Sequence, residues 1–283
     1  MVLESLTNPL QAERNPFKMI FLGLLYASVA LFVSLWIFRD QASLVMVFLT
    51  VMACIPLFYN TLKLEEKKDI TIEKESVLLK EHGKALEFLM FLFVGFTLAF
   101  AIWYVFLPSD LLQNAFSTQT QTILQINSGV TGNAMIKFGV FSKILFNNIK
   151  VLIFCLLFAF LYGAGAIFIL TWNASVIGVA IGNFVRTNIS TLAETHHLFI
   201  VGNYLHIFSL GLLRYAIHGI PEILSYFVGG LAGGIISIAV IRHDFGTKKF
   251  EHIVLDSSEL IILSLVLLFV GALLEVYVTP LLF

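Results

Sequence analysis

The sequence predicts an all-α, polytopic transmembrane helical bundle with about seven crossings plus a re-entrant or half-helix pair. Hydrophobic residues make up 59% of the 283 residues, and only 12% are charged. About a quarter of a soluble globular chain is charged, so this chain has too few charges to coat a water-facing surface. Several apolar runs reach the ~20 residues that a bilayer requires. The net charge of −1 provides no basic field, so we expect no nucleic-acid partner.

Residues 1–62 are expected to form an N-terminal transmembrane hairpin. The apolar run 17–38 is long enough to span a bilayer. The polar residues 39–41 (RDQ) then make a tight turn, and the apolar run 42–59 returns.

The composition changes sharply in residues 63–85, which we interpret as a charged cytoplasmic segment forming a short solvated hairpin or helix at the membrane face. Residues 63–84 hold six lysines and five glutamates. Lysine-rich loops stay on the cytoplasmic side of a membrane. We therefore expect a multi-pass protein of the cell membrane whose N-terminus is cytoplasmic.

Residues 86–283 are predicted to form a second membrane domain. The apolar run 86–107 is its first span, running outward, and 149–170 is its second, running inward. Between them, residues 108–146 are rich in Gln, Asn, Ser and Thr. By parity this stretch is an extracytoplasmic loop, and it is too long for a simple turn.

Two apolar segments, 173–184 and 198–213, are too short for ordinary spans. We favour a re-entrant or half-helix pair, because the basic loop 242–258 then stays cytoplasmic. Full crossing of both segments is the alternative. The long run 216–241 and the final run 260–277 complete the predicted spans.

His218 and Glu222 are the most conspicuous ionisable groups in an apolar segment. Their i, i+4 spacing places them on one helix face. Pro221 suits the first turn of a helix, so we expect a helix to begin near Ile220. The favoured interpretation is a structural hydrogen-bonded pair. The alternative is an intramembrane site that binds an ion, relays a proton or activates water.

Further polar residues offer additional ligands for such a site, although no H-E-x-x-H motif is present. Helix capping is sufficient to explain Asn173. Arg186 and Arg214 are each candidates to pair with Glu194 or Glu222. We assign no catalytic residue and expect no cofactor, and we leave metal binding open. The candidate polar cluster comprises His218, Glu222, Glu194, His196, His197, Arg214 and Asn173.

Glycines recur at four-residue spacing in the predicted membrane segments, which allows another backbone to come close. The favoured interpretation is packing between helices of one chain, and a homo-oligomer face is the alternative. The pairs are Gly178 with Gly182, Gly229 with Gly233, and Gly230 with Gly234.

Three stretches, FNNIKVLIFCLLFAFLYGAG, WNASVIGVAIG and HGIPEILSYFVGGLAGG, together resemble the stage II sporulation protein M (SpoIIM) family over roughly residues 86–280. The resemblance implies an integral membrane protein without an established catalytic activity. In spore-forming bacteria, members act in engulfment with partners that degrade peptidoglycan, and many members occur in organisms that make no spores. The matching residues are Asn147, Asn148, Gly163, Asn173, Gly178, His218, Gly219, Glu222, Gly230 and Gly234.

The sequence therefore favours a non-enzymatic membrane protein that scaffolds or assists an envelope-remodelling or transport complex. Its expected partners are the lipid bilayer, other membrane or envelope proteins and, as one alternative, copies of itself. Two other functions stay open. One is an intramembrane metal-dependent hydrolase that uses His218 and Glu222, and the other is a small-solute or ion permease.

Overall fold

The computed structural model describes residues 7–72, 74–127, 134–159, 164–193, 200–242 and 246–282. These residues are almost entirely helical and include no strand, which confirms the predicted all-α class. The elements in chain order are α2 (Pro9–Arg14), α3 (Lys18–Ile37), η1 (Arg39–Gln41), α4 (Ala42–Thr71), α5 (Glu75–Phe106), α6 (Ser109–Asn127), α7 (Ala134–Ala159), α8 (Ala164–Ala193), α9 (Ile200–Ile241), α10 (Lys248–Leu273), the π-helical η2 (Leu274–Val278) and α11 (Thr279–Leu282).

Seven helices in the described residues are long and apolar enough to cross a membrane, namely α3, α4, α5, α7, α8, α9 and α10. A helix is the natural solution for such runs, because it satisfies its backbone groups internally where no water is available. The protein is thus a multi-pass membrane protein, and the seven candidate spans among its described residues agree with the prediction of about seven crossings.

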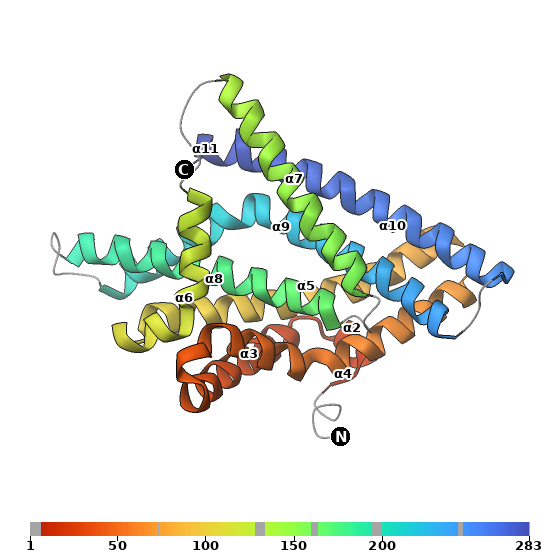
Figure 1. Ribbon diagram of the computed structural model, residues 1–283, viewed down its shortest axis with the longest axis horizontal. Helices are drawn as coiled ribbons and strands as arrows, with labels where there is room; N and C mark the ends of the chain where they lie inside the picture. The colour runs from red at the N-terminus through yellow and green to blue at the C-terminus, as the bar shows by residue number, and fades with distance from the viewer. Residues whose placement is uncertain are drawn as a thin grey trace.

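The ends of these helices gather at two opposite ends of the bundle (Figure 1). We call one the charged end: it holds α2, the α4–α5 turn and the α9–α10 turn. The other end holds the α3–α4 turn and the C-terminus. The helix α10 begins at the charged end with a side-chain cap, in which Thr247 Oγ1 accepts from the Phe250 amide at 3.2 Å.

The predicted fourth span, 149–170, is wrong. Instead, α7 ends at Ala159 and α8 begins at Ala164. The helix α7 also starts about fifteen residues earlier than the predicted span, in sequence that carries Lys137 and Lys143. Those lysines interrupt the apolar run, so the sequence pattern placed the span too late and concealed a separate crossing by α8.

The two short segments are not separate helices. Residues 173–184 lie inside the continuous 30-residue helix α8. The described part of the second segment, residues 200–213, belongs to the 42-residue helix α9. The expected helix start near Ile220 is likewise wrong, because α9 continues through Pro221. The re-entrant arrangement stays a prediction. It was favoured because it keeps the loop 242–258 cytoplasmic, and a membrane crossing by α8 also places that loop on the cytoplasmic side.

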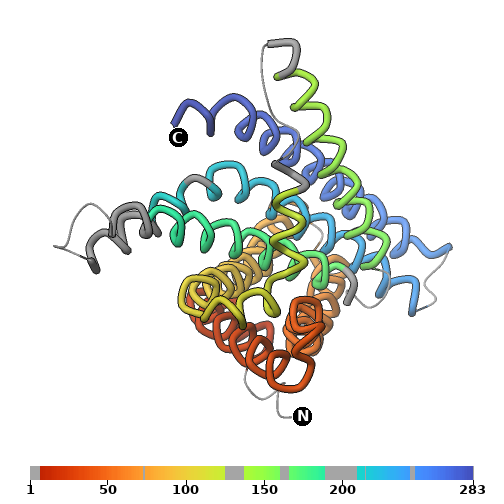
Figure 2. The backbone as a smooth tube through the Cα atoms, turned by 60° about the vertical axis from the view of Figure 1, so that its left-hand side comes forward, coloured from red at the N-terminus to blue at the C-terminus, as the bar shows by residue number. Residues whose placement is uncertain are grey.

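Helix α8 lies at the centre of the molecule. Figure 2 shows α3, α4 and α5 grouped below it and α7, α9 and α10 above it, and α8 contacts α4, α5, α6, α7 and α9. The predicted loop 108–146 holds α6, which docks through its buried Gln119, whose Nε2 donates to Ser43 O at 2.9 Å.

The predicted packing glycines all face other helices of the same chain. A Cβ at any of them would come within 3.3 Å of the neighbouring helix, closer than side chains normally pack. The neighbouring residues are Phe100 for Gly178, Tyr104 for Gly182, Leu152 for Gly229, Ala166 for Gly230, Ala159 for Gly233 and Leu62 for Gly234.

Candidate functional site

His218 lies on α9 and faces the C-terminal helices. The Thr279 hydroxyl donates to the Leu274 carbonyl at 3.1 Å. A hydroxyl has one proton, so Thr279 Oγ1 accepts from His218 Nδ1, 3.2 Å away. This contact lies beside the π-helical turn η2, a local widening that is common at functional positions.

Glu222, one turn further along α9, has partners of its own. Its Oε1 accepts from the Tyr226 hydroxyl at 2.9 Å, and the Asn148 side chain on α7 is a second hydrogen-bond partner. Glu275 of η2 lies close enough to interact with it electrostatically. The His218–Glu222 pair thus belongs to a site that joins α9 to α7 through Asn148 and to the C-terminal elements η2 and α11 through Glu275 and Thr279.

Helix α10 packs against α9 beside this site. A Cβ at Gly271 would lie 3.4 Å from His218 O and 3.5 Å from Glu222 N, which is ordinary van der Waals contact. The carboxyl groups of Glu222 and Glu275 can hold a proton in such a position. The hydrogen bonds of Glu222 and His218 also connect α9 to α7 and to α11.

Three predicted members of the polar cluster, Glu194, His196 and His197, lie outside the described residues, and so does the side chain of Arg214. Within the part of the chain that the structure describes, no group of three His, Cys, Asp or Glu side chains is placed to hold a metal ion. Arg186 has a structural role, because its Nη1 donates to the Tyr104 and Leu107 carbonyls, each at 3.3 Å, at the end of α5.

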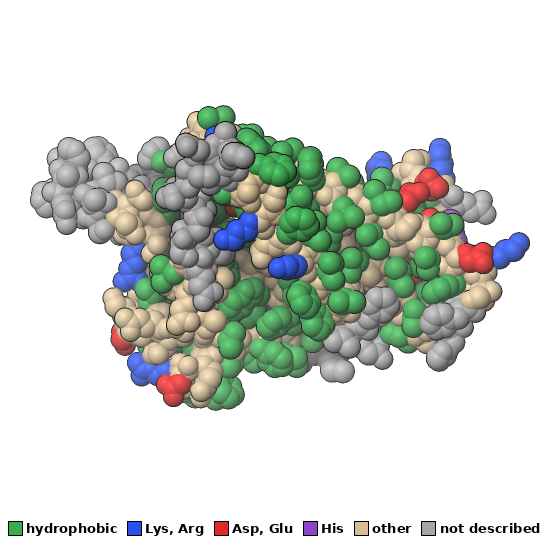
Figure 3. Space-filling model, turned by 45° about the horizontal axis from the view of Figure 1, so that its top comes forward, with side chains coloured by type: hydrophobic (Ala, Val, Ile, Leu, Met, Phe, Trp, Pro, Cys, Tyr) green, Lys and Arg blue, Asp and Glu red, His purple; other side chains and the backbone are tan. Residues whose placement is uncertain are grey.

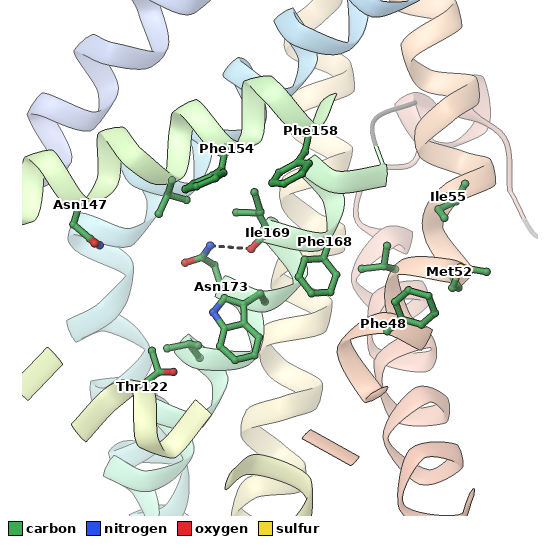
Figure 4. Close-up of a pocket in the computed structure, with 14 residues that line it drawn as sticks. Phe48, Met52, Ile55, Thr122, Asn147, Phe154, Phe158, Phe168, Ile169 and Asn173 are labelled. Atoms are coloured by element: carbon green, nitrogen blue, oxygen red, sulfur yellow. Dashed lines mark hydrogen bonds between the residues drawn. The ribbon is translucent and has the colours of Figure 1, made fainter. Parts of the chain in front are cut away.

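Asn173 belongs to a different place, a mainly apolar groove of about 660 Å³ between α4, α7 and α8. Its Nδ2 donates to Ile169 O at 2.8 Å within α8 (Figure 4), so it bonds inside the helix and does not cap one. Phe154 and Phe158 of α7 enter the groove from one side, with their rings stacked at 5.9 Å.

The groove borders a polar stripe on α7, which we call the α7 lysine stripe and define as Lys143, Asn147 and Lys150. Their i, i+4, i+7 spacing places them on one face, and all three are exposed. No ion pair among the described residues involves either lysine. Figure 3 shows basic side chains on an otherwise mainly hydrophobic part of the surface.

A second polar group, at the charged end, was missed by the sequence analysis. His82 of α5 lies between two carboxylates of α4, with Nδ1 2.7 Å from Glu65 Oε2 and Nε2 2.9 Å from Asp69 Oδ1. Ionised carboxylates only accept, so both bonds require the doubly protonated imidazolium. All three side chains are at most 3% exposed, so they are buried within a segment that was expected to be solvated, whereas neighbours such as Lys67 and Lys80 are exposed.

This group extends to the rest of the bundle. Lys68 Nζ lies 2.9 Å from both Glu13 and Glu65, which ties α2 to α4. Arg242, at the end of α9, donates to the fully buried Glu66 at 2.7 Å. Helix α4 is thereby fastened to the end of α9, in the domain that carries the family resemblance.

A sequence signal for this group exists. His82 falls at i+4 from Leu78 and three residues before Ala85, all buried, so the core face of α5 continues through the charged segment. Composition averaged over the segment concealed that periodicity.

The comparison with known families agrees with the sequence resemblance. A family model described as Stage II sporulation protein M matches residues 88–280, which include His218, Glu222, the groove residue Asn173 and the α7 lysine stripe. No curated protein and no solved structure matches the chain. The matched range begins in α5, ends in α11 and covers more than half of the sequence. The chain therefore belongs to the stage II sporulation protein M family.

Proposed function

We propose that this protein is a non-enzymatic membrane scaffold that assists an envelope-remodelling or transport complex by binding a partner's transmembrane helix along α7. The observation that carries the proposal is the exposed α7 lysine stripe. Measured along the helix at ~1.5 Å per residue, Lys150 lies ~14 Å from the Ala159 end of a 23-residue span. A charged side chain there is costly unless it has a partner.

The remainder of α7 supports the same function. Only 17% of its apolar window is buried, the smallest share among the seven candidate spans. The stripe is basic, so the complementary occupant is a membrane helix with a carboxylate at the matching depth. The neighbouring apolar groove, with Phe154 and Phe158 exposed, would receive that helix's hydrophobic side chains.

The test is to reverse the charge at Lys150 in the full-length protein in its native membranes. We expect native gel electrophoresis to show a high-molecular-weight assembly for the wild type, and we expect Lys150→Glu to remove it. Lys137→Glu is the matched control, because Lys137 is an exposed lysine of the same helix that lies well off the stripe at 100° per residue. The control should retain the assembly.

Stability of the purified protein separates binding from folding. Lys150→Met should leave the isolated protein at least as stable as the wild type, because it removes an unpaired charge from an apolar surface. An unchanged assembly in Lys150→Glu would contradict the proposal. So would an assembly that contains only copies of this chain, because the proposal requires a different protein with an acidic membrane helix.

A further inference from the structure

Helix α4 separates its charges by sign where it reaches the charged end. Its last nine residues contain three lysines and three carboxylates. Glu65, Glu66 and Asp69 are at most 1% exposed, whereas Lys63 and Lys67 are exposed. The two lysines share one face of the helix, because residues at i and i+4 are neighbours on its surface. A stretch that carries no net charge in the sequence therefore presents a basic outer face.

The buried carboxylates at this end of α4 do not neutralise the outer face. They bond to other elements through His82 of α5 and Arg242 of α9, and to Lys68 of α4 itself. Among the residues that the structure describes, neither Lys63 nor Lys67 forms an ion pair. The positive charge of these two side chains is therefore directed to the surroundings of the protein.

The outer face continues a surface of α4 that is exposed to lipid. Met52, Tyr59 and Lys63 follow one another at i, i+7 and i+11, which places them on one side of the helix. Met52 is 49% exposed, and Lys63 Nζ lies 4.5 Å from the centre of the Tyr59 ring. Tyrosine is typical of the membrane–water interface, and a lysine beyond it keeps its ammonium group in the polar layer. The face thus passes from hydrocarbon depth to headgroup depth over ~16 Å of helix.

We propose that this surface, which we call the α4 basic face and define as Tyr59, Lys63 and Lys67, binds the headgroup phosphate of an anionic phospholipid. The lysine ammonium groups donate to the phosphate oxygens, and lysines beside a membrane attract anionic lipid. The acyl chains lie along the apolar part of the same helix face, at Met52 and Pro56. A lipid fits better than a soluble phosphate because the basic and apolar parts of the face are continuous.

The α4 basic face is separate from the partner-binding surface on α7. Ile55 is the residue of α4 nearest the charged end that lines the apolar groove, and Lys63 lies ~12 Å further along the helix. A partner helix in the groove and a lipid headgroup at Lys63 can therefore be bound at the same time. Lipid binding at the α4 basic face does not require a partner protein.

The start of α10 provides a matched control at the same end of the molecule. Lys248 and Lys249 are also exposed. Glu251 and Glu259 lie at i+3 and i+11 from Lys248, so two exposed carboxylates share the face of that lysine. Replacing this lysine pair changes the net charge as much as replacing the pair on α4 does, and it leaves the α4 basic face intact.

The test is a titration of the purified full-length protein, in micelles of detergent and phosphatidylcholine, with phosphatidylglycerol that carries a pyrene-labelled acyl chain. Binding is followed by energy transfer from the tryptophans of the protein. Each lysine near an anionic lipid contributes a factor of about five in affinity. We expect Lys63→Gln to weaken binding about fivefold, and Lys63→Gln combined with Lys67→Gln to weaken it about 25-fold. The control pair Lys248→Gln, Lys249→Gln should bind as the wild type does.

Equal affinity of the wild type and the double α4 variant would overturn the proposal. Equal weakening by the control pair would also overturn it, because the general positive charge of this end would then account for binding. Displacement of the lipid by inorganic phosphate would identify a soluble anion as the ligand and contradict a lipid site. The pair Lys63→Arg, Lys67→Arg should retain binding, because arginine keeps the charge and donates to phosphate.

Discussion

The contact between α3 and α5 depends on two glycines, Gly23 and Gly95, that face each other. A Cβ at Gly95 would lie 2.3 Å from Ile20 O and 3.0 Å from Gly23 Cα. Both neighbours are backbone atoms, so no side chain can rotate away. The substitution Gly95→Ala must therefore push the two helices apart.

The size of this effect follows from the distances. An ordinary Cβ contact is 3.4–4 Å, so the helices must separate locally by about 1 Å, which forfeits a quarter to a half of each affected dispersion contact. Overpacking of this kind costs about 1–3 kcal/mol, and the better helix propensity of alanine returns up to ~1 kcal/mol. We expect the free energy of unfolding to fall by about 1–2 kcal/mol.

The same helix provides a matched control. A Cβ at Gly83 of α5 would meet no neighbouring atom within 4 Å, so Gly83→Ala should raise stability by about 0.5–1 kcal/mol. The assay is unfolding by dodecyl sulfate in mild detergent, followed by tryptophan fluorescence. Trp103 donates to Ser28 Oγ across the α3–α5 contact at 2.8 Å and reports on it directly. Equal stability of the two alanine variants would refute the argument.

Two further predictions concern topology and the α9 site. Single cysteines at Ser76 and Ser117, both exposed, should label from opposite sides of the membrane with an impermeant thiol reagent when the native cysteines are absent, and labelling from one side would refute the topology. Glu222→Leu should cost about 1–3 kcal/mol, because it leaves the buried Tyr226 hydroxyl and Asn148 amide without their acceptor. Glu222→Gln keeps an acceptor and should cost less, as measured by the same unfolding assay, and equal losses in the two variants would contradict this account.

The membrane spans were largely predictable from the sequence, and the exceptions have a common cause. A single long apolar run spans a bilayer as a helix. The sequence therefore predicted α3, α5 and the second half of α9 from their apolar runs alone. The predicted start of α7 was too late because Lys137 and Lys143 lower the local apolar content, although both side chains are exposed on the helix surface. Whether a lysine ends a span or lies on its surface depends on neighbours that the sequence does not reveal.

The sites were less predictable. His218 and Glu222 could be singled out because ionisable groups are rare in apolar segments, but their partners Thr279 and Asn148 come from helices distant in sequence. The polar group around His82 was misinterpreted, because charged residues in a charged segment carry no signal of burial. Only the docking of α4 against α5 shows that they are inside.

The sequence by itself determined the all-α class, the membrane location, the approximate number of crossings and the family, because these depend on local composition and on a few residues in fixed order. The tertiary structure decided which polar groups meet. It placed Glu66 beside Arg242, 176 residues away, and left Lys150 exposed. Those outcomes depend on how helices pack side by side, and hydrophobic periodicity specifies which face of a helix is buried but not which helix covers it.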